Sequence, residues 1–424
     1  MIKHVSPLII IPAALCILFF TPYGYAFEYQ FDVEIFEGLF KEDNYLDEAA
    51  GTFDYDETYN ILGLYPECTI DFGGNISGYA LGELEWVYSW DAADQYDQSD
   101  ENDQEAKLSD VFLSYSLSGF SVDVGLQPFL VGKGIVFYGD EPGIAFRYDA
   151  WKDTYIKGDI FQIFDNSTMA KMTFGYVPGF WESVEIIGAW YHDADDRIAE
   201  LYEPFYENAD LESSGHLFWV GGQADFFVDN MFVSCLMLHQ FGSVEIDDGS
   251  GGPDLDVSAY LIDLELNYNI SSQFSAGAFV FTASGDRNPM KGSLNAFISP
   301  MPFNQRTVIF FNGGFERYDI EEAVLLGGVT WDGVIAPGVK FEYQPNLKIV
   351  TELVVALLFP QGDLFNTDVW YGWEADARLS YEFYQNHKLF VEAGIFEHGD
   401  FFKNKYGFQP DPATRVVAGI SLIF

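Results

Sequence analysis

The last ten residues of the chain, "RVVAGISLIF" (415–424), alternate between two faces when drawn as an extended strand. One face carries only apolar side chains: Val416, Ala418, Ile420, Leu422 and Phe424. A strand at the border of an open sheet leaves an unpaired edge, which proteins avoid. A closed barrel has no edge, because its last strand pairs with its first. The stretch therefore predicts a barrel in which 415–424 pairs with a first strand near residues 33–41.

The same two-residue period runs through the rest of the chain. It is clear in "ISGYALGELEWVYSW" (76–90), "YLIDLELNYN" (260–269) and "EADARLSYEFY" (374–384), each with one apolar and one polar face. The stretch "DVFLSYSLSGFSVDVGLQ" (110–127) indicates a hairpin that turns at Ser118-Gly119. These patterns predict strands with an apolar outer face and a polar inner face.

Short and long connections alternate between the predicted strands. The short ones lie at 73–75, 118–119, 150–153, 228–230, 344–346 and 385–387. The long ones are acidic and lie at 42–58, 91–106, 192–214, 242–256, 284–305, 359–369 and 399–412. Short turns at one rim and long loops at the other are typical of a transmembrane antiparallel β-barrel, and strand-like segments here indicate about 18 strands, within a range of roughly 16 to 20.

Residues 1–26 have the features of a cleaved signal peptide. Lys3 gives a positive start, 5–20 is largely apolar, and the small residues Gly24 and Ala26 fit a cleavage site. A membrane anchor is the alternative interpretation. We expect residues 27–424 to be secreted as one domain. This domain has no apolar run of about 18 residues or more, the length that a transmembrane helix needs.

Composition narrows the function further. The formal net charge is −46 and aromatic residues make up 18% of the chain. A polyanion such as nucleic acid would be repelled. The bacterial outer membrane is the location that fits, and the partners expected there are membrane lipid, lipopolysaccharide and the barrel-assembly machinery. Cys68 and Cys235 are interpreted as two isolated thiols, with one disulfide as the alternative.

Inward-facing charges are the candidate selectivity residues of such a barrel, because charges in a lumen favour counter-ions. The acidic candidates are Glu83, Glu85, Asp123, Asp263, Glu265, Glu342, Glu374, Asp376 and Glu392. The basic candidates are Lys133, Arg147, Lys157 and Lys171. The basic group either forms a ladder opposite acids at a constriction or makes ordinary ion pairs, such as Arg147 with Asp149 or Lys157 with Asp159.

The stretch "PFLVGKGIVFYGDEP" (128–142) is the best candidate for a loop that folds into the lumen. It is more apolar than the other long loops, and Gly132 and Gly134 permit tight turns. A loop that points outward is the alternative.

Enzymatic motifs and metal-spaced histidines are not found, so the sequence does not indicate an enzyme, and no cofactor is expected. The acidic loops 91–106 and 242–256 offer oxygen ligands that calcium prefers, without the spacing of an EF-hand. A calcium-bridging role is one interpretation, and a solvated acidic rim is the other.

Two stretches resemble the alginate-export family of outer-membrane porins. "FTASGDRNPMKGSLNAFISPMPFN" (281–304) is similar to a family segment through Ser284, Gly285, Asp286, Asn288 and Pro289, with Arg287 inside the motif and Phe297 and Pro302 beyond it. "SVDVGLQPFLVGKGIVF" (121–137) resembles another family strand, with Leu126 where the family has arginine. The resemblance implies an 18-stranded barrel and export of alginate through an arginine-rich lumen.

The end of the chain resembles the assembly signal of outer-membrane barrels, which implies that the assembly machinery reads Phe424, Leu422 and Ile420. Three functions remain open. The first is a porin-like channel for small solutes or ions, preferring cations or neutral solutes, with a charged constriction. The second is polysaccharide export, which the few basic residues disfavour. The third is a surface or adhesion barrel, with a plugged lumen and acidic loops that bind partners.

Overall fold

The computed structural model describes most of the chain beyond its N-terminal segment. The described residues are 28–47, 52–89, 102–163, 166–177, 181–200, 211–247, 254–286, 292–300, 306–311, 330–361 and 369–424. The predicted signal peptide, residues 1–26, lies outside these ranges, as do residues 91–101 of the acidic loop 91–106 and 248–253 of the acidic loop 242–256.

The described residues are mostly strands. The first nine are β1 (Glu28–Asp47), β2 (Thr52–Gly73), β3 (Ile76–Ser89), β4 (Asn102–Leu117), β5 (Phe120–Val131), β6 (Phe137–Trp151), β7 (Thr154–Ile163), β8 (Ser167–Tyr176) and β9 (Trp181–Asp193). The next are β10 (Glu212–Val228), β11 (Met231–Asp247), β12 (Asp254–Asn269), β13 (Phe274–Ala283), β14 (Ser293–Leu294) and β15 (Val334–Asn346). The last are β16 (Ile349–Leu358), β17 (Gly372–Tyr384), β18 (His387–His398) and β19 (Ala413–Ile423). Three short helical segments are α2 (Arg197–Glu200), η4 (Thr330–Asp332) and α3 (Asp400–Tyr406).

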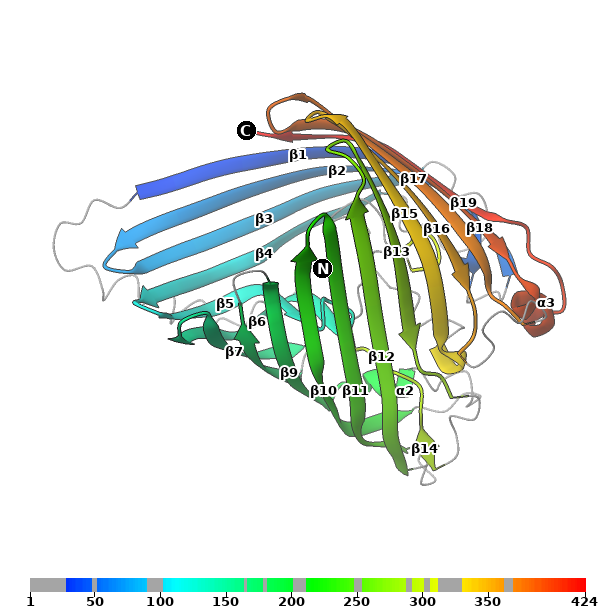
Figure 1. Cartoon of the computed structure of the whole chain (residues 1–424), viewed down its shortest axis with the longest axis horizontal. Helices are drawn as coiled ribbons and strands as arrows, with labels where there is room; N and C mark the ends of the chain where they lie inside the picture. Colours follow the sequence, from blue (N-terminus) through cyan, green and yellow to red (C-terminus); the bar gives the residue numbers. More distant parts are fainter. Residues whose placement is uncertain are drawn as a thin grey trace.

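Neighbouring strands pair antiparallel all the way around the wall, and β19 returns to β1 (Figure 1). The sheet has 19 strands, but β14 is a two-residue strand that pairs in parallel with β12 inside the long β13–β15 connection. The wall of the barrel is therefore 18-stranded, as the sequence predicts. The closing register runs from Glu34 opposite Ile423 to Asp43 opposite Thr414, which confirms the predicted pairing of the terminal strand with the first.

The predicted short connections join consecutive strands at one rim, which we call the short-turn rim, with the 344–346 turn displaced to 347–348. The other rim, the long-loop rim, carries the longer connections. Three predicted loops are wrong in part. In 42–58, β1 and β2 stay paired up to Asp47 opposite Thr52, and in 242–256, β11 and β12 stay paired up to Glu245 opposite Asp254. Residues 102–106 of the predicted loop 91–106 belong to β4. Polar outward side chains do not disrupt a hairpin that projects beyond the apolar part of the wall, since backbone pairing alone sustains it.

The outer face of the wall is apolar, as the two-residue period predicts. On β12, Leu264, Leu266 and Tyr268 are exposed, whereas Asp263, the residue before Leu264, is buried on the inside. No helix among the described residues is long and apolar enough to cross a membrane. Cys68 and Cys235 are both free thiols, which confirms the interpretation of two isolated cysteines.

The inner face differs from the prediction in its half toward the long-loop rim. There the inward side chains are apolar and buried, as at Leu217 and Trp219 of β10 and Leu255 and Val257 of β12. They pack in one core with segments of the β13–β15 connection, including Phe297 and Phe310. The expectation of a polar inner face throughout is therefore wrong for this half, because segments inside the barrel give those apolar side chains a partner.

Candidate functional site: the lumen

Every predicted acidic lumen residue lies on an inward position of the wall. Glu83 is 2.8 Å from Nζ of Lys107, and Tyr65 donates a 2.7 Å hydrogen bond to Glu85. Ser114 of β4 donates to Asp123 of β5. Glu342 of β15 lies opposite Glu352 of β16 in register, and Arg378 of β17 pairs with both Glu352 and Glu392 of β18. The inner surface is thus held together by hydrogen bonds and ion pairs between adjacent strands.

The predicted basic group makes ion pairs of this kind. Nε of Arg147 is 2.9 Å from Asp149, as the alternative interpretation expects. Lys157 differs from that interpretation, since it approaches Glu185 at 3.9 Å. The side chain of Asp159 instead pairs with Lys171 at 2.8 Å. Asp159 lies directly opposite Lys171 in the β7–β8 register, which explains that pair, whereas Glu185 of β9 lies one strand beyond β8 from Lys157.

The 128–142 stretch is a β5–β6 hairpin whose tip lies inside the barrel. The side chains of Phe129, Val131 and Val136 are buried in the inner core. Gly132 and Lys133 have positive φ angles of 58° and 59°, which make the tip tight. A Cβ on Gly132 would lie 2.9 Å from Leu238 of β11, so the tip rests closely on the opposite wall.

Lys133 at this tip reaches Asp263 of β12. Its Nζ is 3.3 Å from the Asp263 carboxylate and 2.5 Å from Oγ of Ser234. Lys171 steadies the hairpin by donating a 2.8 Å hydrogen bond to the carbonyl of Leu130. The structure thus brings together Lys133 of the β5–β6 hairpin, Lys171 of β8 and Asp263 of β12, three residues that the sequence analysis predicted in the lumen.

Arg306 is a lumen residue that the sequence analysis did not identify. It lies in the β13–β15 connection and donates to Asp263 at 2.7 and 2.8 Å, and also to Glu265. Its guanidinium carbon is 5.3 Å from the centre of the Phe279 ring. Asp263 therefore receives two cations, Lys133 and Arg306, from two different inner segments. A residue in an irregular loop has no repeating pattern around it. The one available signal was that Arg306 directly follows the predicted 284–305 loop.

The segment that follows Arg306 is fixed to β17 by two buried carboxylates. Glu374 accepts hydrogen bonds from the backbone N–H groups of Ile309 at 2.5 Å and Phe310 at 2.9 Å. Asp376 accepts one from Val308 at 3.3 Å. Both carboxylates are almost completely buried. They point inward as predicted, but their partner is backbone of an inner segment.

The Ser-Gly-Asp motif holds the same connection at the long-loop rim. Ser284 donates to the carbonyl of Asn295 at 2.8 Å, and Asp286 accepts the N–H of Asn295 at 2.9 Å. A Cβ on Gly285 would lie 2.2 Å from the backbone of Asp332, so only glycine permits this approach. The other motif positions, Arg287, Asn288 and Pro289, lie outside the described residues, as does Pro302. The described part of the motif therefore has a structural role.

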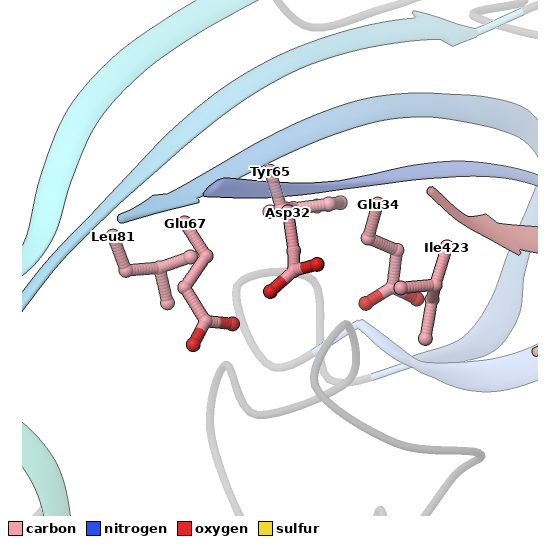
Figure 2. Close-up of a pocket in the computed structure, with 6 residues that line it drawn as sticks. All are labelled: Asp32, Glu34, Tyr65, Glu67, Leu81 and Ile423. Carbon is pink, nitrogen blue, oxygen red and sulfur yellow. The ribbon is translucent and has the colours of Figure 1, made fainter. Parts of the chain in front are cut away.

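An acidic recess lies near the short-turn rim. Asp32 and Glu34 of β1 and Glu67 of β2 direct their carboxylates toward one cavity of about 190 Å³ (Figure 2). The side chains that complete its lining are Tyr65, Leu81 and Ile423. Among the residues that the structure describes, no group of three or more histidines, cysteines or acids is arranged to hold a metal ion. The recess adds negative charge at this end of the lumen.

Comparison with known proteins finds likeness in structure alone. The sequence matches no protein-family model and no curated protein. A BenF-like porin from Pseudomonas fluorescens Pf-5 aligns with a TM-score of 0.58 and 10% identity, over 94% of this chain and 99% of that one. OccK8 (OprE) of Pseudomonas aeruginosa aligns with a TM-score of 0.56 and 13% identity, over 94% and 98%. OccAB3 of Acinetobacter baumannii aligns with a TM-score of 0.56 and 10% identity, over 94% and 100%. The chain shares their barrel fold along nearly its whole length.

Proposed function

We propose that this protein is a channel of the bacterial outer membrane that passes small solutes or ions. The observation that carries the proposal is a closed 18-stranded wall with an apolar outer face and charged side chains on its inner face. Barrels of 16 to 18 strands are wide enough for an aqueous channel. The fold likeness to a BenF-like porin over nearly the full length of both chains supports the same function.

We further propose that the channel prefers cations or neutral solutes. Each predicted basic residue of the lumen has a carboxylate within ion-pair distance: Lys133 with Asp263, Arg147 with Asp149, Lys157 with Glu185 and Lys171 with Asp159. The acidic recess of Asp32, Glu34 and Glu67 adds further negative charge. Excess negative charge along a low-dielectric wall raises the local concentration of cations.

The test is the conductance and reversal potential of the purified protein in a planar bilayer under a potassium chloride gradient. We expect stable conductance with a reversal potential that shows cation preference. The triple variant Asp32→Asn, Glu34→Gln, Glu67→Gln should weaken that preference. The control is Asp411→Asn, which removes an exposed acid before β19 at the long-loop rim. Absence of conductance from folded protein would overturn the channel proposal.

A surface barrel without transport is the second candidate. The apolar packing of inner segments against the long-loop half of the wall favours it, because a plugged lumen needs such a core. Polysaccharide export, which the resemblance to the alginate-export family implies, is the third candidate. Anion preference in the bilayer experiment would support export of a polyanion, and binding of surface ligands without conductance would support the surface barrel.

A further inference from the structure

The segment Arg306–Phe311, which we call the strap, connects two separate parts of the inner wall. At its start, Arg306 binds Asp263 and Glu265 on β12. Further along, the N–H groups of its backbone bind Glu374 and Asp376 on β17. The strands β13, β15 and β16 lie between these two attachments in the wall. The strap thus lies inside the barrel and restricts the lumen in this structure.

The attachment on β12 has the composition of a guanidinium-binding site. Asp263 and Glu265 stand two residues apart on the same inward face, and Phe279 of β13 lies opposite Glu265 in register. Arg306 lies between these carboxylates and the aromatic ring, with its guanidinium carbon 5.3 Å from the ring centre. A guanidinium group is planar, donates parallel N–H hydrogen bonds to carboxylates and stacks on aromatic rings. This site therefore suits a guanidinium group better than a spherical cation.

Removal of Arg306 leaves Asp263 compensated. Nζ of Lys133 is 3.3 Å from the Asp263 carboxylate. Glu265 in turn accepts a 2.7 Å hydrogen bond from the amide of Asn267. The penalty for an uncompensated buried charge is therefore reduced when Arg306 leaves, because Asp263 keeps a cation and Glu265 keeps a neutral hydrogen-bond donor. On β17, Glu374 and Asp376 accept the backbone N–H groups of Val308, Ile309 and Phe310, and Arg415 of β19 donates a 3.4 Å hydrogen bond to the carbonyl of Val308.

We propose that the strap is a movable constriction of the lumen, held in place because Arg306 fills a guanidinium site that a solute bearing a guanidinium group takes in its place. Arg306 acts as an internal ligand, so a free guanidinium group competes for Asp263 and Glu265 and releases the N-terminal attachment. The inference rests on the proposed channel function for its role in transport, but the release of the strap is measurable without conductance.

The first test follows exposure of the strap by thiol labelling. The parent protein carries Ile309→Cys, with Cys68→Ser and Cys235→Ser, and is labelled by a water-soluble maleimide. Labelling should be slow in sodium chloride and faster in guanidinium chloride at the same low ionic strength. Arg306→Gln should raise the rate at least about tenfold, because it removes three charge-assisted hydrogen bonds and even one has an effect of about this size. It should also remove the guanidinium response.

The matched control is Arg147→Gln, which removes a lumen arginine paired with Asp149 on the same strand, β6. Its labelling rate and guanidinium response should equal those of the parent. Amide hydrogen exchange at Val308, Ile309 and Phe310 in the protein without cysteine substitutions gives a second readout. If neither guanidinium nor Arg306→Gln changes labelling or exchange, the strap is a fixed part of the fold and the inference is wrong.

Conductance separates this inference from the function on which it rests. Arg306→Gln should increase the open-channel conductance or the time spent open, and Arg147→Gln should not increase the time spent open. If the barrel conducts but Arg306→Gln equals the unmodified protein in conductance, labelling rate and amide exchange, the channel proposal holds and the strap proposal is wrong. Faster labelling without conductance in any variant supports a releasable strap and overturns the channel.

Discussion

Glu374 is the residue whose loss should most directly loosen the inner segments. Its buried carboxylate accepts the N–H groups of Ile309 and Phe310. Each buried N–H left without an acceptor costs about 1 to 3 kcal/mol. Glu374→Ala should therefore accelerate amide exchange at these two residues about thirtyfold, equivalent to about 2 kcal/mol. Glu374→Gln keeps one acceptor oxygen and should have a smaller effect.

The control for this prediction is Glu382→Ala on the same strand, since Glu382 accepts only the exposed turn N–H of Asn386. Exchange at Ile309 and Phe310 should not change in that variant. Equal exchange in Glu374→Ala and the unmodified protein would show that water or another group receives these N–H groups in solution.

Asp195, between β9 and α2, gives the barrel a pH-dependent contact at the long-loop rim. Partial burial raises the pKa of this carboxyl, but hydrogen bonds from Asn166 and Ser167 outweigh burial and hold the pKa below its ordinary value. A lowered folded pKa means that the carboxylate stabilises the fold above the ordinary pKa, and that this contribution is lost as pH falls through the folded value.

The amide resonances of Asn166 and Ser167 should accordingly stay constant at neutral pH and shift only in acid below the ordinary range for aspartate, about pH 4. Asp195→Asn should abolish that shift. A titration of these amides at the ordinary aspartate value would show that the contact does not form in solution.

At the residue scale, the sequence predicted which side chains face inward far better than it predicted their partners. Alternation alone placed Asp263 and Glu265 inside, because strand geometry fixes the face of each side chain. The pairing of Lys157 with Glu185 depends on the register of neighbouring strands, which local sequence does not contain. Arg306 was missed because contacts from an irregular segment leave no repeating pattern.

At the scale of the element, β19 carries the proposed assembly signal. Phe424 is 63% exposed on the outer face, and its ring centre lies 5.0 Å from that of His387. Its backbone pairs with Val33 through two hydrogen bonds, which Phe424→Ala leaves in place. We therefore expect this variant to lower strongly the amount of folded protein in the outer membrane. The free energy of unfolding of the purified protein should change by less than about 0.5 kcal/mol.

The matched variant is Phe383→Ala, which removes an outward phenylalanine at the same rim of β17. Its assembly in cells should stay near that of the unmodified protein, as measured by the heat-modifiable fraction in outer-membrane preparations. Equal losses in both variants would show that general apolar surface at this rim, and not the terminal residue, directs assembly.

Most elements were predicted from alternation and turn residues, and the errors have a common physical origin. The 42–58 stretch is acidic, and β1 and β2 stay paired within it up to Asp47 and Thr52 by backbone pairing, which is independent of side-chain type. The 128–142 hairpin was predicted as a loop that folds into the lumen. Its apolar residues and its glycines indicated burial and tight turning, but neither property distinguishes a loop from a paired hairpin.

At the scale of the whole molecule, the closed wall followed from the terminal strand and the count of alternating segments. The apolar inner half did not follow from these features. A strand that is apolar on both faces needs a partner on each side, and here the inner partner is the β13–β15 connection and the β5–β6 tip. Such long-range packing leaves no local signal, because the residues that meet are far apart in the sequence.

The net charge of the molecule leads to a last prediction about ion selectivity. The formal charge is −46, and the basic lumen residues are paired with acids. Long-range fields are screened over about 30 Å at 0.01 M salt and about 3 Å at 1 M. Cation preference in the planar bilayer should therefore be strong in dilute potassium chloride and nearly vanish near 1 M. Selectivity that stays constant across this range would place its origin in direct contacts at a narrow constriction, and the field of the whole barrel would then have no part in choosing the ion.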